Sequence, residues 1–136
     1  MNNYHPAQLE SELQNYGDEP IIRVVMMPKH TNAMGTIFGG VVLSHLDLAA
    51  SEEARKSVEG PVVTKVLREV DFIAPVNVGD WISCYTRTDR IGETSVTVSV
   101  LVVAQRGHAR EEICKVTQAE AVFVAVDENG KPTQIS

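Results

Sequence analysis

One acidic side chain, Asp47, occupies a place where a carboxylate can do chemistry. It lies in the segment VVLSHLDLAA, whose apolar residues recur with the period of an amphipathic helix. On a helical wheel Asp47 falls at the border of the apolar face, so its carboxylate is partly removed from water. Such a carboxylate suits a general base or a nucleophile. A solvated aspartate on the helix surface explains this position equally well when it is taken alone.

Two glycines, Gly39 and Gly40, lie just before this helix. At a helix N-terminus the amides lack internal acceptors, and a glycine leaves room for a ligand to approach. Such N–H groups, helped by the helix dipole, can hold a carbonyl oxygen that becomes negative. Tight packing of the helix on a sheet is the alternative role. The nearby Asn32 can orient water or a carbonyl, although a loop asparagine more often caps a turn.

The histidines and cysteines do not predict a metal site. His30 and His45 have no third ligand at a convincing spacing, which favours a loop histidine and a helix-surface histidine. Cys84 and Cys114 each lie in an apolar run without CxxC spacing, so we expect buried thiols. A disulfide between them stays open at this stage.

A helix and five strands are predicted to position these residues. The helix extends from Val41 to Val58 and ends before Gly60 and Pro61, with a buried face made of Val42, Leu43, Leu46, Ala49, Ala50 and Ala54. β-branched and alternating runs predict strands at 21–27, 62–72, 81–88, 95–102 and 113–126. The segments between the last four predicted strands, at 75–80, 89–93 and 106–110, are short enough to connect antiparallel neighbours. A short helix is expected at 6–16.

These elements predict an α+β fold in which one antiparallel sheet curls around one long helix. The chain of 136 residues, 43% of them apolar, favours a single domain at 21–136 behind a polar N-terminal extension at 1–20. Open sheet edges invite pairing with another copy. The end of the last strand is apolar on both faces, which also predicts at least a dimer; these residues are Ala121, Val122, Phe123, Val124, Ala125 and Val126.

Charge and segment composition exclude several classes of partner. The formal net charge of −6 argues against a nucleic-acid or anionic-membrane surface, because such surfaces rely on a broad basic field. The first twenty residues do not read as a signal peptide, and no apolar run is long enough to cross a bilayer. We therefore expect a protein of the reducing cytoplasm.

The segment HTNAMGTIFGGVVLSHLD resembles the signature of the hotdog-fold acyl-CoA thioesterases of the YciA and cytosolic acyl-CoA hydrolase group. Further matches follow in register at DFIAPVNVGD, GETSV and FVAVDENGKP, so the resemblance covers residues 21–132. It implies a hotdog fold with the Gly39–Val58 helix at its centre. It also implies edge-to-edge dimers that often assemble into trimers of dimers, and active sites between protomers.

The resemblance assigns roles to the residues above. Asp47 and Asn32 would be a functional pair from different protomers, with Gly39 or Gly40 donating to the thioester oxygen. The reaction would be hydrolysis of an acyl-CoA thioester, without any cofactor beyond that substrate, in which Asp47 activates water or attacks directly. A thiol leaving group is acidic enough, with a pKa of roughly 8.5, to need no strong general acid.

Coenzyme A contacts are expected at a hairpin and one cation: Gly92, Thr94, Ser95 and Arg106. A plain hairpin and a solvated arginine are the alternatives. Arg68 shares a face with apolar residues, which favours an interface ion pair over a substrate contact.

The chain departs from the family pattern at His30, Met34 and Thr36, which leaves the loop chemistry and the preferred acyl length open. Two other functions remain open. A hotdog hydratase or dehydratase would suit the glycine-rich loop, although the family-like catalytic His paired with an acidic helix residue is not found. A non-catalytic acyl-CoA sensor would have to act through another protein.

Overall fold

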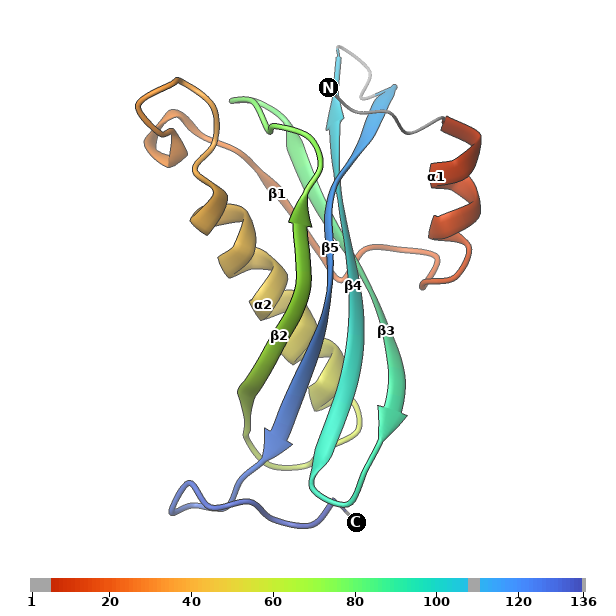
Figure 1. Cartoon of the computed structure of the whole chain (residues 1–136), viewed down its shortest axis with the longest axis vertical. Coiled ribbons are helices and arrows are strands. Elements are labelled where there is room, and N and C mark those ends of the chain that lie inside the picture. Colours follow the sequence, from red (N-terminus) through yellow and green to blue (C-terminus); the bar gives the residue numbers. More distant parts are fainter. Residues whose placement is uncertain (1–5, 108–110, 136) are drawn as a thin grey trace.

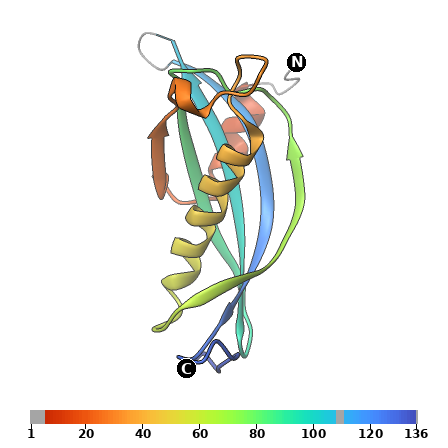
Figure 2. The ribbon, with the colours of Figure 1, turned by 90° about the vertical axis from the view of Figure 1, so that its left-hand side faces the viewer.

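The computed structural model describes residues 6–107 and 111–135. In it, one curved β-sheet wraps around one long helix (Figure 1). The five strands are all antiparallel, in the spatial order β1-β3-β4-β5-β2. Helix α2 lies along one face of the curved sheet, and α1 lies on the opposite face (Figure 2). In chain order the elements are α1 (Pro6–Leu13), β1 (Ile22–Val25), the 3-10 turn η1 (Pro28–His30), α2 (Gly39–Arg55), β2 (Val62–Phe72), β3 (Trp81–Ile91), β4 (Ser95–Arg106) and β5 (Glu112–Ala125).

Helix α2 is the central helix that the periodicity predicted. All of the residues predicted to be buried are buried except Leu43, which is half-buried. Glu53, which was not predicted to be buried, is buried as well. The predicted end at Val58 is three residues too late. The amides of Lys56, Ser57 and Val58 bond to carbonyls three residues back, as in the tightened last turn of a helix. The apolar stripe packs on the inner face of the sheet and forms the main core.

The strands lie where they were expected, with shifted ends. Pairing of β3 with β4 continues to Ile91 opposite Val96, so the predicted break at 89–93 shrinks to the turn after Ile91. Strand β1 is shorter than predicted. The break expected at 106–110 is seen only in part, because residues 108–110 lie outside the described residues.

The N-terminal segment packs against the outer face of the sheet. Leu9 of α1 is buried against Leu101 and Val103. The ammonium group of Lys115, which is fully buried, donates a hydrogen bond to Glu12 of α1 at 3.0 Å. The segment at 1–20 was predicted as a polar extension. Over its described residues it contributes a helix that covers the buried Lys115. This helix ends at Leu13 rather than at the predicted Tyr16.

The long open edge of the sheet belongs to β2. The apolar end of β5 lies inside the sheet, between β4 and β2, so its main chain is already paired. Strand β2 has a neighbour on one side only, and Val63 and Phe72 remain about half exposed along it. An unpaired edge of eleven residues is a ready template for a second chain. In the described part of the chain, no helix combines the length and the apolar character that a membrane crossing requires.

Candidate active site

The loop before α2 is held in shape by Asn32. The side-chain oxygen of Asn32 accepts hydrogen bonds from the amides of Met34 (2.9 Å) and Thr36 (3.2 Å), and its amide nitrogen donates to the Thr36 hydroxyl (3.0 Å). This is the turn-capping role that sequence reasoning kept as the alternative. One N–H of the side-chain amide has no partner among the described residues and can serve a ligand. His30 also supports the loop, because its Nδ1 accepts from the Met27 amide (3.0 Å).

The first turn of α2 presents two free donors. The amides of Gly39 and Gly40 have no hydrogen-bond acceptor among the described residues, as expected at a helix N-terminus. A Cβ at Gly39 would lie 3.6 Å from the Phe72 ring, an ordinary contact, whereas a Cβ at Gly40 would lie 2.5 Å from the ring of Phe38. Phe38 is 57% exposed and its ring can move aside, so packing does not by itself require glycine at either position.

Asp47 is half-buried on the side of α2 that faces the open edge. Its Oδ1 accepts a hydrogen bond from the Thr64 hydroxyl of β2 at 2.9 Å, and its Oδ2 has no partner within the described ranges. Thr64 therefore fixes one oxygen and leaves the other free. Both residues line a shallow groove of about 390 Å³ together with Gly40, Leu43, Ser44 and Leu67. Thr64 was missed at the sequence level, since it lies 17 residues from Asp47 and carries no local signal.

Within one chain, Asp47 and the glycine amides are too far apart to act on one carbonyl group. An α-helix rises 1.5 Å per residue, so Asp47 lies about 12 Å along the axis from Gly39. An attacked carbonyl carbon and its oxygen must each lie about 3 Å from their protein partners. A site that uses both the glycine amides and Asp47 would therefore take them from different chains.

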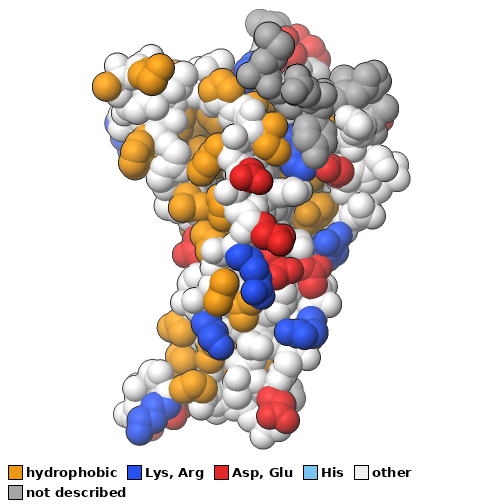
Figure 3. Space-filling view, viewed as in Figure 1, with side chains coloured by type: hydrophobic (Ala, Val, Ile, Leu, Met, Phe, Trp, Pro, Cys, Tyr) orange, Lys and Arg blue, Asp and Glu red, His pale blue; other side chains and the backbone are white. Residues whose placement is uncertain are grey.

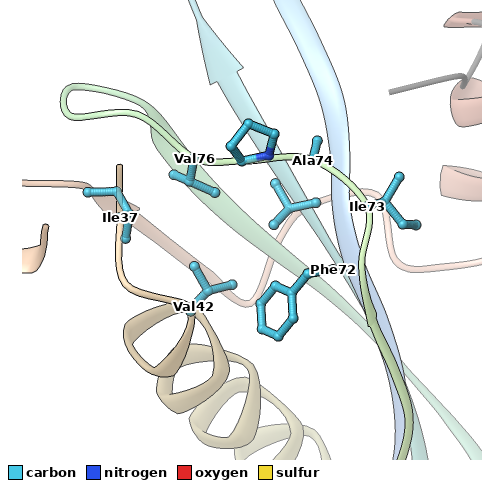
Figure 4. Close-up of a pocket in the computed structure, with 9 residues that line it drawn as sticks. Ile37, Val42, Phe72, Ile73, Ala74 and Val76 are labelled. Carbon is cyan, nitrogen blue, oxygen red and sulfur yellow. The ribbon is translucent and has the colours of Figure 1, made fainter. Parts of the chain in front are cut away.

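An apolar pocket of about 280 Å³ opens beside Gly39 (Figure 4). Its walls come from the start of α2, from the segment that follows β2, and from β5. No lining side chain is polar; the pocket is formed by Ile37, Gly39, Val42, Phe72, Ile73, Ala74, Pro75, Val76 and Val116.

The predicted coenzyme A contacts lie at opposite ends of β4. Gly92, Thr94 and Ser95 form the β3–β4 turn, where the Gly92 amide bonds to the Ser95 carbonyl and the Thr94 carbonyl accepts from Ala125. Arg106 ends the same strand, eleven residues after Ser95, which is about 36 Å away at 3.3 Å per residue. One chain does not bring the turn and the guanidinium together. Their coenzyme A roles stay predictions that would need different protomers.

Arg106 instead holds the turn between β2 and β3. Its Nη2 donates to Asp80 Oδ2 (2.8 Å) and to the Pro75 carbonyl (3.2 Å). Asp80 is 3% exposed, and the same Oδ2 accepts the Asn77 amide (2.9 Å). The guanidinium is thus already committed to a buried carboxylate.

Replacing Arg106 with alanine is expected to lower the free energy of unfolding by about 3 kcal/mol, because the buried Asp80 carboxylate loses its charged partner. Urea denaturation measures this change. Arg90→Ala, at an exposed arginine of β3, is the control and should change stability by less than about 0.5 kcal/mol. An Arg106→Ala protein as stable as the parent would contradict the structural role.

Glu53 is a buried carboxylate that the periodicity did not single out. It is 8% exposed and accepts hydrogen bonds from Thr86 (2.9 Å), Thr88 (2.7 Å) and Lys56 (3.0 Å). Burial alone raises the pKa of Glu53, but the hydrogen bonds from Thr88, Lys56 and Thr86 outweigh it and hold the pKa below its ordinary value. Glu53 therefore ties the C-terminal half of α2 to β3 as a charged group.

Charged residues on the sheet are largely paired within the chain. Arg68 of β2 bonds to Glu120 of β5 at 2.6 Å, so the ion pair expected at an interface is intramolecular here. Arg87 pairs with Asp89 at 2.8 Å. Acidic and basic side chains lie close together on the face seen in Figure 3.

The thiols are unsuited to nucleophilic chemistry. Cys84 and Cys114 are free, and burial raises the pKa of the Cys84 thiol to about 12. Burial also raises the pKa of Cys114, which is half-buried rather than buried as predicted. The thiolate, the reactive form of a cysteine, is therefore disfavoured at both positions.

Comparisons with known proteins all find similarity to thioesterases. Residues 34–110 match the family model of the thioesterase superfamily. The acyl-CoA thioester hydrolase YciA of Escherichia coli (strain K12) is 39% identical over 115 residues, covering 82% of this chain and 86% of that protein. An uncharacterized acyl-CoA thioester hydrolase of Zymomonas mobilis is 40% identical over 135 residues, covering 99% of this chain and 90% of that protein.

Solved structures are similar over the same region. A hexameric hotdog fold thioesterase of Campylobacter jejuni superposes with a TM-score of 0.81 at 42% identity, covering 87% of this chain and 90% of that one. A hexameric thioesterase from Yersinia pestis has a TM-score of 0.82 at 33% identity, covering 88% of this chain and 98% of that one.

Proposed function

The chain belongs to the thioesterase superfamily, and on that premise we propose that it hydrolyses acyl-CoA thioesters in a site shared between two protomers. The resemblance found in the sequence is confirmed, and so are the hotdog fold and the enzyme class, an acyl-CoA thioester hydrolase. One observation carries the shared site: Gly39 and Gly40, whose amides are free, lie on the same helix as Asp47 but about 10 to 12 Å from it along the helix axis.

A second copy paired along β2 would close this gap. Within each chain Gly39 lies against Phe72, near one end of β2, and Asp47 bonds to Thr64, near the other end. Antiparallel pairing of two β2 edges around Arg68 would set Thr64 of one protomer opposite Phe72 of its partner. The glycine amides of one chain would then face Asp47 of the other. The unpaired β2 edge supports this arrangement.

The proposed chemistry follows from these positions. The Gly39 and Gly40 amides hold the thioester oxygen, and Asn32 of the same loop adds its remaining N–H. Asp47 of the partner either takes a proton from an attacking water or attacks the carbonyl carbon itself. The carbon–sulfur bond breaks, the coenzyme A thiolate leaves, and water supplies the oxygen of the free acid. A negative charge on the oxygen would be stabilised by these free N–H donors, so the proposed reaction requires no cofactor.

The assembly and compartment are part of the same proposal. Dimers of this chain would associate further into hexamers, a state supported by the hexameric thioesterases of Campylobacter jejuni and Yersinia pestis. The reducing cytoplasm as the compartment is supported by two free thiols and no disulfide in the described residues.

Release of free thiol from acyl-CoA substrates tests the function directly. We expect the purified protein to release one thiol for each acyl-CoA consumed, without added metal or cofactor. Hydration of an enoyl-CoA without thiol release would instead identify a hydratase. Tight acyl-CoA binding with no thiol release at high enzyme concentration would identify a sensor.

A further inference from the structure

The C-terminal segment, residues 132–135, folds back onto the end of β5. The turn before it is held by Asp127, whose amide donates to the Lys131 carbonyl (2.8 Å) and whose Oδ1 accepts from the Lys131 amide (3.0 Å). The chain then runs antiparallel to the residues that it follows, and Val126 forms a bridge with Pro132. The direction of the C-terminal segment is therefore fixed by backbone contacts.

This segment also bonds to the β3–β4 turn. The Ile135 amide donates to the Glu93 carbonyl at 2.7 Å, and the Ile135 side chain packs against the main core. Ala125 joins the segment and the turn, because its amide donates to the Thr94 carbonyl (2.8 Å) and its carbonyl accepts from the Thr133 amide (2.8 Å). Figure 1 shows the segment and the turn at the same end of the molecule. Two consecutive carbonyls of the turn are thus held by the C-terminal segment and by β5.

A carbonyl that is held in place also fixes the direction of the next amide. The peptide bond is planar and trans, so the Thr94 N–H points opposite to the Glu93 carbonyl, away from the C-terminal segment. This N–H has no acceptor in the part of the chain that the structure describes. A backbone donor that points outward from a turn suits an anion such as a phosphate group. The Glu93 carboxylate is exposed, so water and salt screen its repulsion of that anion.

We infer that the C-terminal segment positions the β3–β4 turn for the phosphates of coenzyme A, with Ile135 as a positioning residue that acts through Thr94. The inference rests on the proposed thioesterase function. Asp47 lies about 12 Å along the axis of α2 from Arg55, which ends the helix at the same end of the molecule as the turn. The pantetheine arm of coenzyme A can extend over such a span, so a thioester carbonyl near Asp47 lets the phosphates reach the turn.

Thiol release from butyryl-CoA and from S-butyryl pantetheine tests this role, because pantetheine lacks the phosphates. Ile135→Pro removes the amide hydrogen that holds the Glu93 carbonyl. The KM for butyryl-CoA is expected to rise about tenfold, which corresponds to one hydrogen bond to a charged group. The kcat for both substrates and the KM for S-butyryl pantetheine should stay within about twofold of the parent, because only a binding contact is lost. Gln134→Ala, at the exposed neighbouring residue, is the control and should leave all these constants within about twofold.

Two results would overturn the inference: a parental KM for butyryl-CoA in folded Ile135→Pro, or an equal rise in KM for both substrates. Should Ile135→Pro fail to fold, Ile135→Gly decides. It keeps the amide but loosens the segment, and it should raise the KM for butyryl-CoA alone, by about threefold.

A different result would contradict the proposed function. A parent that releases no thiol from either substrate is not a thioesterase for them. Calorimetric binding of coenzyme A then still tests the C-terminal segment, because Ile135→Pro should bind coenzyme A about tenfold more weakly than the parent. Equal affinity of the two proteins for coenzyme A would contradict the positioning role.

Discussion

Changing Asp47 to asparagine is expected to lower kcat for thiol release by about a thousandfold. Asparagine has the same shape and keeps an oxygen that accepts the Thr64 hydroxyl, now at 2.9 Å from Asp47. It lacks the negative charge that takes a proton from water or attacks the carbonyl carbon. The measurement is thiol release at saturating acyl-CoA, with the melting temperature recorded on the same sample.

A matched control for this change lies on the same helix. Glu52 is partly exposed on α2 and, among the described residues, pairs with Arg55 across one turn at 3.0 Å. Glu52→Gln removes one negative charge from the helix surface and should leave kcat within about twofold of the parent, because exposed pairs contribute little. Parental turnover by Asp47→Asn in a folded protein would remove Asp47 from the mechanism.

Mixing two inactive variants is expected to restore activity, which is the strongest consequence of a site built from two chains. The first variant is Asp47→Asn. The second is Asn32→Asp, which keeps the oxygen that accepts the Met34 and Thr36 amides but loses the side-chain N–H groups. Each variant alone should lose activity by about a hundredfold or more.

Random pairing of the two variants makes half of the dimers mixed, and each mixed dimer contains one site with both native residues. The mixture, prepared by co-expression or by joint refolding, should therefore recover about a quarter of the parental activity. If Asp47 and Asn32 of the same chain formed the site, every site would carry one defect. A mixture no more active than its two components would thus overturn the shared site.

Much of this architecture was predictable because local spacing encodes it. The period of the apolar residues placed α2 and its buried face correctly, and Asp47 at the border of that face is indeed half-buried. Alternation placed the strands within a few residues of their observed ends. The observed ends differ from the predicted ends in two situations. In β3 the strand pairing continues beyond the alternating pattern, and after Arg55 the last turn of the helix is tightened.

Other features could not be read from the sequence because they depend on distances between parts of the chain that lie far apart in it. Arg106 was assigned to coenzyme A from its charge and position in the sequence. Its actual partner, Asp80, was brought beside it when the turn after β2 folded back on the end of β4. Glu53 was overlooked because the threonines that stabilise its charge, Thr86 and Thr88, are more than 30 residues away.

The sequence by itself determined the order of the elements, the helix that carries Asp47 and the glycines at its N-terminus, since these depend on residue types a few positions apart. Only the tertiary structure decided which groups meet. The register of the sheet brought Thr64 to Asp47, and three distant segments enclosed the apolar pocket beside Gly39. The rise of a single helix then separated Asp47 from the two glycines by about 10 to 12 Å along the axis, and this distance is why the proposed site requires a second chain.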